Sequence, residues 1–371
     1  MMKRMKILFS FGAALLVLAG VNARGADSLD DIMPVRGFCI GAPNPKGVDQ
    51  FIKFIDEGLA PKHINTLILR VDYNYQFTSH PELAEKNSLS LADVKRLVAD
   101  CKSNNIHLIP QINLLGHQGF GASENPLLIK YPEFDETPWV KNPEHYKWPN
   151  DDNLYCRSYC PLHPKVHEVV FACVDEICDA FESDAFHAGM DEVFYLGEDK
   201  CPRCGGKNKA KLFADEVTLI HDHLRDKGRK LWMWGDRFID GRVTGLGEWE
   251  ASYNGTAPAI DMVPKDIMIC DWHYDRADLT APYFAMHGFN VVECPWKLAS
   301  VGAQEADDMI QWRRRGPPEI RERLQGVLQT VWSGAGGFIR NDYQSDPGKT
   351  NAWNCLLAVE GELEKAQGAG K

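Results

Sequence analysis

The 371-residue chain has little positive charge. Its 41 Lys and Arg residues are outnumbered by 52 Asp and Glu residues, which gives a formal net charge of −11, and it contains no long basic run. Because binding to nucleic acid or to an anionic membrane surface depends on clustered cations, the composition argues against both as main partners. The chain also lacks low-complexity linkers and internal repeats, so one large domain accounts for it.

A convincing membrane span is also lacking. The apolar run from Ile7 to Gly20 is short and begins almost at the amino terminus, after three basic residues, and small residues such as Ala23 follow it. This layout is typical of a secretory signal peptide, and no Cys follows the run at a lipoprotein-like position. We therefore expect residues 1–23 to be a signal peptide, residues 27–371 to form the catalytic domain, and the protein to be exported to the periplasm or the medium.

The eleven cysteines are odd in number, so they cannot all be paired within one chain. Several lie inside apolar segments, where a buried thiol behaves as a small hydrophobic group. Examples are Cys39, Cys101, Cys270 and Cys294. Four others form two short-spaced pairs, Cys156 with Cys160 in CRSYC and Cys201 with Cys204 in CPRC. These pairs suit either a tetrahedral structural zinc site or two disulfides, and the spacing does not decide between them.

Eight short apolar runs rich in β-branched residues recur along the chain. They are VRGFCIGA (35–42), INTLILRV (64–71), IHLIPQIN (106–113), AFHAGMDE (185–192), KLWMWGD (230–236), DIMICDW (266–272), NVVECPW (290–296) and GVLQTVW (326–332). Helical patterns lie between most of them, including Val48–Leu59, Leu91–Asn104, Val166–Phe181, Lys209–Lys227 and Ala277–His287. Strand and helix alternating eight times predict an α/β protein with a (β/α)8 TIM barrel as its single catalytic domain.

The longest irregular stretch, residues 116–161, follows the third predicted strand. It is rich in Pro, Asn, Asp and aromatic residues, including Trp139 and Trp148. Long loops after barrel strands usually shape the mouth of the active site, so we expect this segment to do so.

Catalytic groups in such a barrel stand at the carboxyl-terminal ends of the strands. The polar and aromatic residues found there are Asp72, His117, Asp191, Glu192, Trp234, Asp236, Trp272, Tyr274, Trp296 and Trp332. Asp191 and Glu192 end the fourth run. Mutual repulsion and burial can separate the pKa values of two such carboxyl groups, so that one is an acid while the other stays ionised. Cleavage of a glycosidic bond needs that combination.

Five segments carry a family resemblance. HAGMDEVF (187–194) resembles the HxGGDE signature of glycoside hydrolase family 20, the β-N-acetylhexosaminidases. LIPQINLLGHQ (108–118) resembles the IPEIDMPGH segment of that family, and RVDYNYQF (70–77) its second-strand end. LWMWGDR (231–237) resembles its WDE segment, and QTVWSG (329–334) its final Trp strand. The similarity spans most of the predicted barrel.

This resemblance implies a substrate-assisted mechanism with net retention, in which the 2-acetamido oxygen of the sugar attacks the anomeric carbon. Glu192 would protonate the leaving oxygen and later deprotonate water, while Asp191 would orient the acetamido group and stabilise the oxazolinium-like intermediate. His117 and Asp72 would form a relay that tunes the acid. The substrates would be glycans with a terminal β-linked GlcNAc or GalNAc, and catalysis would require no cofactor.

Aromatic side chains at the strand ends predict the walls of a sugar pocket. Trp234, Trp272 and Trp332 would enclose the acetamido methyl group and stack on the sugar ring. Tyr274 would hold the acetamido carbonyl and Asp236 a sugar hydroxyl. Trp296 stands where the family has a Tyr, and we expect it to contact the substrate as well.

The chain departs from the family pattern at several places. The first strand ends in CIGAPNP, without the Arg that usually grips outer sugar hydroxyls. Arg70 is a possible substitute, although an inward Arg paired with a carboxylate would explain it equally well. The other departures are Met190 for the second Gly, Gln111 and Asn113 for an acidic pair, and Gly334 for a carboxylate. The usual N-terminal α/β domain is also missing, which predicts a barrel-only member.

Two other functions remain open at this point. A barrel that binds sugars without cleaving them would explain the missing Arg and the missing carboxylate. A zinc-dependent hydrolase would use the paired cysteines with His163, His187 and His273, although four Cys ligands would close the metal shell and so favour a structural ion.

Overall fold

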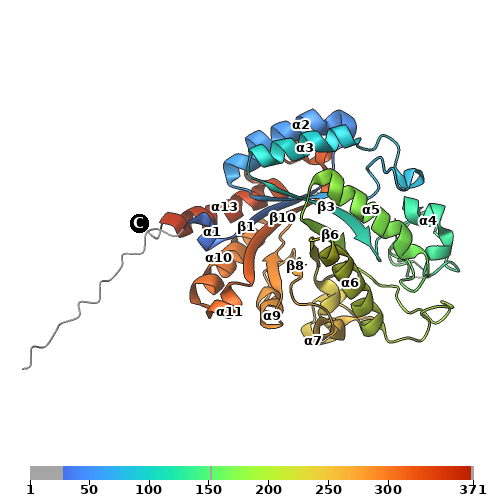
Figure 1. Cartoon of the computed structure of the whole chain (residues 1–371). Helices are drawn as coiled ribbons and strands as arrows, with labels where there is room; N and C mark the ends of the chain where they lie inside the picture. The colour runs from blue at the N-terminus through green and yellow to red at the C-terminus, as the bar shows by residue number, and fades with distance from the viewer. Residues whose placement is uncertain (1–27, 151–152, 369–371) are drawn as a thin grey trace, which may run out of the picture.

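A computed structural model describes residues 28–150 and 153–368, and the predicted signal peptide lies outside the described residues. The eight predicted runs form the strands of one closed parallel barrel (Figure 1). They are β1 (Val35–Gly41), β2 (Thr66–Arg70), β3 (His107–Leu114), β6 (Ala185–Gly189), β7 (Lys230–Trp234), β8 (Met268–Asp271), β9 (Asn290–Glu293) and β10 (Leu324–Gly334). Neighbours around the barrel follow the order β1, β10, β9, β8, β7, β6, β3, β2. The predicted (β/α)8 barrel is confirmed.

Long helices cover the outside of the barrel (Figure 1). They include α2 (Val48–Phe54) with its π-helical continuation η2 (Ile55–Leu59), α3 (Leu91–Ser103), α5 (Val166–Phe181), α6 (Lys209–Asp226), α9 (Thr280–Met286), α10 (Ala299–Arg315) and α13 (Ala352–Gly368). The five helices predicted above are among them, with bounds that differ by at most three residues. Local signals fix their starts: Ser90 and Asp93 form a capping box at α3, and the Asn208 side chain caps α6.

Short elements fill the connections. They are α1 (Leu29–Ile32), η1 (Pro45–Gly47), η3 (Ala60–Lys62), η4 (Pro81–Leu83), η6 (Asp236–Phe238), α7 (Gly241–Thr244), α8 (Gly247–Glu250), η7 (Ala257–Asp261), α11 (Pro318–Arg321) and α12 (Ala335–Asn341). Between β7 and β8, four of these short helices stand where a regular barrel has one long helix.

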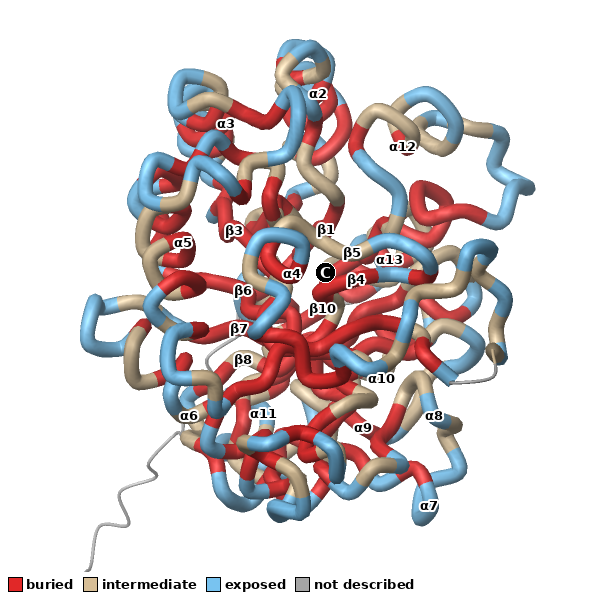
Figure 2. The backbone as a smooth tube through the Cα atoms, turned by 90° about the vertical axis from the view of Figure 1, so that its right-hand side faces the viewer, coloured by how far each residue is buried: buried red, intermediate tan, exposed pale blue. Residues whose placement is uncertain are grey.

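The barrel interior is a packed core rather than a pore. One hydrophobic cluster takes residues from all eight strands, which is possible only inside the barrel. Its members are Val35, Cys39, Ile68, Ile109, Ala185, Trp232, Trp234, Cys270, Trp272, Val292, Cys294 and Leu328. The larger cluster fills the space between strands and helices, and buried backbone runs through the centre of Figure 2 while exposed segments lie at the periphery. The four cysteines predicted to be core are buried.

The segment between β3 and α5 carries its own small elements. They are the hairpin of β4 (Gly119–Phe120) and β5 (Ser123–Glu124), then α4 (Pro126–Lys130) and η5 (Pro132–Phe134). The buried guanidinium of Arg157 ties the rest together, because it pairs with Asp135 at 2.6 Å and donates to the side-chain oxygen of Asn142 at 3.0 Å. Among the described residues, no helix is both long and apolar enough to cross a bilayer.

Candidate active site

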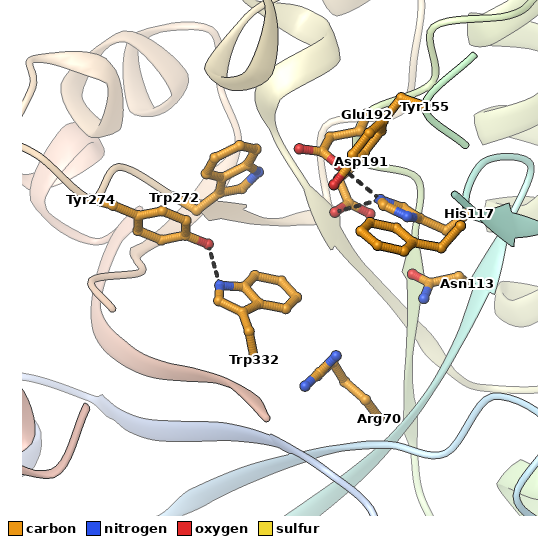
Figure 3. Close-up of a pocket in the computed structure, with 10 residues that line it drawn as sticks. Arg70, Asn113, His117, Tyr155, Asp191, Glu192, Trp272, Tyr274 and Trp332 are labelled. Carbon is orange, nitrogen blue, oxygen red and sulfur yellow. Dashed lines mark hydrogen bonds and ion pairs between the residues drawn. The ribbon is translucent and has the colours of Figure 1, made fainter. Parts of the chain in front are cut away.

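A cavity of about 430 Å³ opens at the carboxyl-terminal ends of the strands (Figure 3). Its lining comes from the ends of β2, β3, β6, β8 and β10 and from the long loop after β3. The lining residues are Arg70, Asn113, His117, Phe120, Tyr155, Asp191, Glu192, Trp272, Tyr274 and Trp332. The structure therefore brings together six of the ten predicted site residues.

The backbone at the end of β6 is strained. Gly189, Met190 and Glu192 have φ values of 68°, 68° and 49°, in the left-handed region. At Gly189 only glycine fits, because a Cβ there would lie 2.1 Å from the Asn113 side-chain oxygen. Met190 adopts the same φ with a fully buried side chain, although this conformation costs about 1–2 kcal/mol for a residue with a Cβ. Strain of this kind concentrates at functional sites, and here it aims the two carboxylates into the cavity.

His117 stands between the two carboxylates, as the dashed lines of Figure 3 show. Its Nε2 atom lies 3.2 Å from Asp191 Oδ2 and 3.3 Å from Glu192 Oε2, which is ion-pair distance without good hydrogen-bond alignment. Burial lowers the pKa of His117, but the charge of Asp191 and contacts with both carboxylates outweigh burial and raise it well above 6.5. Burial in turn raises the pKa of Asp191, and the His117 imidazolium outweighs this and lowers it. The site therefore holds an imidazolium facing ionised Asp191.

Asp72 lies behind this pair. Its Oδ1 atom accepts a hydrogen bond of 2.8 Å from the backbone N–H of Asn113, which fixes the end of β3. Burial raises the pKa of Asp72, and the Asn113 N–H, Arg70 and His117 only partly offset this. No hydrogen bond joins Asp72 to His117 in the described part of the chain, so the predicted relay between them stays a prediction.

Asp236 supports the site from behind the cavity wall. Its carboxylate accepts hydrogen bonds from the Glu192 backbone N–H at 3.0 Å and from Trp272 Nε1 at 3.4 Å, and it pairs with Arg237. Burial raises its pKa to about 6, with Arg237 opposing the shift and Asp191 adding to it. Asp236 does not line the cavity, whereas the sequence suggested direct contact with a sugar hydroxyl. In the structure it positions Glu192 and Trp272.

Aromatic side chains form the opposite wall (Figure 3). Trp332 Nε1 donates a hydrogen bond of 2.7 Å to the Tyr274 hydroxyl oxygen, and the Trp272 and Tyr274 ring centres lie 5.0 Å apart. Trp234 and Trp296 do not line the cavity. Trp234 is fully buried, 5.5 Å from the Trp332 ring, and Trp296 packs behind Tyr274 at 5.4 Å. The predicted substrate contacts of these two residues thus become supporting contacts in this structure.

Two lining residues were not predicted individually. Phe120 and Tyr155 come from the long loop after β3, and their rings lie 5.2 Å apart. The sequence indicated that this loop shapes the mouth, but an irregular segment has no periodicity that identifies the inward-facing side chains. Their position places an aromatic surface beside Glu192.

Arg70 lines the cavity beside the end of β1. Its Nη2 atom donates to the Val331 backbone oxygen at 2.8 Å, and its guanidinium lies 4.8 Å from the centre of the Trp332 ring. In the barrel Arg70 is the register partner of Gly41, and a Cβ built on Gly41 would lie 3.6 Å from Arg70 Nη2. The guanidinium therefore occupies space next to the position where the first strand lacks an Arg.

The short-spaced cysteines require a correction. Cys160, Cys201 and Cys204 cluster with Glu136, while Cys156 lies elsewhere and its Sγ faces the Glu192 backbone oxygen at 3.5 Å. Cys156 is therefore not a member of the group with metal-ligand spacing that contains Cys160. No disulfide joins any of the eleven cysteines.

The histidines of the zinc-hydrolase hypothesis do not form one site either. His163 packs on Phe134 with ring centres 4.7 Å apart, and His187 lies 4.6 Å from the Trp234 ring centre. His273 contacts Glu250 at 2.7 Å. Among the described residues, the other groups with metal-ligand spacing are His117 with Asp191 and Glu192, and Glu250 with His273 and Asp278.

Comparisons with known proteins were made at three levels. The model of the glycosyl hydrolase family 20 catalytic domain matches residues 39–315. A β-hexosaminidase of Akkermansia muciniphila is 30% identical over 124 residues, which cover 33% of this chain and 23% of that protein. Hexosaminidase D of Bos taurus is 23% identical over 184 residues, covering 47% and 48%. The chain thus spans about half or less of the length of these curated relatives.

Solved structures agree in fold. The Flavobacterium johnsoniae chitobiase superposes with a TM-score of 0.61 at 16% identity, covering 90% of this chain and 52% of that chain. The β-N-acetylhexosaminidase of Bacteroides fragilis gives a TM-score of 0.59 at 17% identity, covering 89% and 66%. Because the family model matches most of the barrel, including the strand end that carries Asp191 and Glu192, the chain belongs to glycosyl hydrolase family 20.

Proposed function

We propose that the protein is an exo-acting, retaining β-N-acetylhexosaminidase that removes terminal β-linked GlcNAc or GalNAc from glycans. The observation that carries this proposal is the arrangement of two carboxylates with His117 between them, facing a wall of Trp272, Tyr274 and Trp332 across one cavity. The volume of about 430 Å³ is within the range of small-molecule pockets, which suits a terminal sugar.

The reaction divides into two steps. In the first, the acetamido oxygen of the substrate attacks the anomeric carbon, the glycosidic bond breaks, and Glu192 gives its proton to the leaving oxygen. Asp191 accepts a hydrogen bond from the acetamido N–H and stabilises the positive charge of the oxazolinium intermediate. In the second step, Glu192 takes a proton from water, which attacks the same carbon and opens the oxazolinium ring. Two inversions at one carbon give net retention.

Arg70 takes the role of the missing strand-one Arg in this proposal and binds outer sugar hydroxyls. Its cavity-lining position next to Gly41 supports this role. Its stacking on Trp332 also keeps the guanidinium oriented, because a cation over an indole ring is attracted by the ring face. The backbone oxygen of Val331 accepts from Nη2, which uses one of the five N–H groups of the guanidinium.

The test is release of nitrophenol from β-GlcNAc and β-GalNAc substrates by wild type, Glu192→Gln and Asp191→Asn. We expect turnover by wild type and a loss of roughly 10²–10⁴-fold in each variant. A β-glucoside without the acetamido group is the matched substrate control and should not be cleaved. Glu192→Gln should lose less activity on a dinitrophenyl glycoside, whose leaving group needs no proton. Sugar binding without turnover by wild type would instead support a non-catalytic binding barrel.

We also propose export, directed by residues 1–23. The support is the basic and apolar layout of that segment. The test is fractionation of cells that express the full chain or a chain lacking residues 2–23. The full chain should appear outside the cytoplasm with a shortened amino terminus, and equal distribution of both forms would refute the proposal.

A further inference from the structure

A second cluster of reactive side chains lies apart from the sugar cavity. It consists of Glu136 and Cys160 from the loop after β3 and of Cys201 and Cys204 from the loop after β6. All four side chains are buried, and one ligand atom from each lies within 4.8 Å of all the others. The proposed sugar chemistry uses none of them.

The sulfur positions match the edges of a metal tetrahedron. Cys160 Sγ lies 3.6 Å from Cys201 Sγ and 3.8 Å from Cys204 Sγ. A tetrahedral zinc ion with bonds of about 2.3 Å to sulfur holds its sulfur ligands about 3.8 Å apart. A disulfide has sulfurs about 2.0 Å apart, and joining two of these atoms would leave the third thiol beside a buried carboxylate.

Glu136 supplies an independent observation that a cation belongs here. Its side chain has no exposed surface and makes no salt bridge among the described residues. It accepts a hydrogen bond of 3.0 Å from the Glu198 backbone N–H, and the Cys204 thiol contacts both of its oxygens at 2.8 and 2.9 Å. Burying a carboxylate without a positive partner is costly, and a bound cation removes this cost.

Backbone N–H groups also face the sulfurs. N–H groups of Arg203 and Cys204 point at Cys201 Sγ, and the N–H of Leu162 points at Cys160 Sγ. Gly205, directly after Cys204, allows the tight turn, because a Cβ there would lie 2.6 Å from the Cys201 backbone oxygen.

We propose that Glu136, Cys160, Cys201 and Cys204 bind one structural Zn²⁺ ion in a closed tetrahedral shell of three thiolates and one carboxylate. On binding, the three thiol protons pass to solvent and no electron is transferred. Four protein ligands leave no open position for substrate, so the ion stabilises structure and takes no part in hydrolysis.

The ion would join the two loops that carry the catalytic groups. The loop after β3 also holds His117 and Tyr155, and the loop after β6 begins with Asp191 and Glu192. Within the described residues, direct contacts already link them, such as Cys156 Sγ with the Glu192 backbone oxygen. A metal crosslink would hold the separation between His117 and the carboxylates against thermal opening of either loop.

The first experiment measures metal on the full chain purified under reducing conditions without a metal-affinity column. Elemental analysis should give one zinc per chain. X-ray absorption at the zinc edge should show three sulfur ligands at about 2.3 Å and one oxygen ligand at about 2.0 Å. Cobalt substituted for zinc should give thiolate charge-transfer and tetrahedral ligand-field bands.

Variants identify the ligands. Cys201→Ser and Glu136→Gln should each weaken zinc retention against a competing chelator by at least about tenfold. Cys156→Ser should retain zinc, as should Cys178→Ser, which removes a buried thiol of α5 that is not part of the cluster. Should a ligand variant fail to fold, the absorption spectrum of wild type still distinguishes three sulfurs from four or none. Wild type that binds no zinc, a disulfide between any two of the three cysteines, or four sulfur ligands would overturn the proposal.

Discussion

The position of His117 between two carboxylates leads to a quantitative prediction for the variant His117→Gln. The imidazolium Nε2 lies 3.2 Å from Asp191 and 3.3 Å from Glu192. At such a distance one ion pair is worth about 1.3 kcal/mol in water and about 5 kcal/mol at the effective dielectric of partly buried sites. Because the Asp191 and Glu192 side chains are only 8% and 13% exposed, the upper part of this range applies.

Loss of the imidazolium should change the pH dependence of activity as well as its size. In wild type His117 outweighs burial and holds the pKa of Asp191 below 3.8. In the variant the largest effects that oppose burial are removed, so the pKa of Asp191 rises and the acidic limb of the kcat/KM profile moves to higher pH. At the optimum, even the smallest attraction of about 1.3 kcal/mol corresponds to a tenfold loss.

The ion pair of His117 with Asp191 should also make the stability of the fold depend on pH. A carboxyl group whose pKa is depressed in the folded state stabilises the fold above 3.8 and loses this contribution as the pH falls through its folded value. His117→Gln removes the contribution, so its Tm should fall relative to wild type near neutral pH and approach it in acid. The assays are kcat/KM profiles on an aryl β-GlcNAc substrate and thermal unfolding across the same pH range.

The matched control is His107→Gln. His107 Nε2 lies 2.6 Å from Asp184 Oδ1, but the two side chains are 42% and 65% exposed, and His107 is at the start of β3 rather than at its catalytic end. An exposed pair contributes about 0–1 kcal/mol, so activity and the acidic limb should stay unchanged. An unmoved acidic limb in His117→Gln, or a loss of activity no larger than that of the control, would refute the reasoning.

Three further predictions concern two residues of the cavity and one buried carboxyl group of α10, that of Glu305. Arg70→Met should raise KM by about ten- to a hundredfold with a smaller change in kcat, because about 1.5–3 kcal/mol of hydrogen bonding to sugar hydroxyls is lost. Steady-state kinetics measures this, and an unchanged KM would contradict the proposed role of Arg70. Tyr274→Phe should lower kcat by about 10²–10³-fold on nitrophenyl substrates, because it removes the hydroxyl that we expect to hold the acetamido carbonyl and that accepts from Trp332. Full activity would exclude that contact. Glu305→Gln should raise Tm near neutral pH but not near pH 4.5. Burial and neighbouring carboxylates raise the pKa of Glu305 well above 4.5, so the folded state loses stability as the pH rises above 4.5. A Tm gain that does not depend on pH would point to packing instead.

The barrel could be predicted because its strands are covered on both faces. Runs such as INTLILRV and NVVECPW are apolar throughout, as expected for parallel strands between an inner core and outer helices. The helix starts predicted at Leu91 and Lys209 from apolar spacing coincide with the observed starts, which Ser90 and Asn208 cap. The missing long helix between β7 and β8 could not be inferred, because short helices with Gly-rich connections carry no sustained periodicity.

The site was predictable where a strand ends and less so elsewhere. Asp191 and Glu192 follow a buried strand directly, so their direction is set by the barrel. Asp236 also follows a strand, but the 3-10 helix η6 turns its carboxylate toward Glu192 and Arg237, which sequence spacing does not reveal. Cys156 was grouped with Cys160 by spacing alone, whereas the structure places Cys160 with Cys201, Cys204 and Glu136, and Glu136 has no spacing signal in the sequence.

The pairing of Gly41 with Arg70 bears on how the history of such a site is read. A position-by-position comparison of this chain with the family pattern would record the loss of an Arg from the first strand and no gain of a cation elsewhere. In three dimensions the neighbouring strand presents a guanidinium beside the vacated place, since register partners stand side by side across a parallel ladder. With the proposed role of Arg70, divergence transfers a cation laterally from one strand to the next. Relatives that carry both residues, or neither, would mark the stages of that exchange.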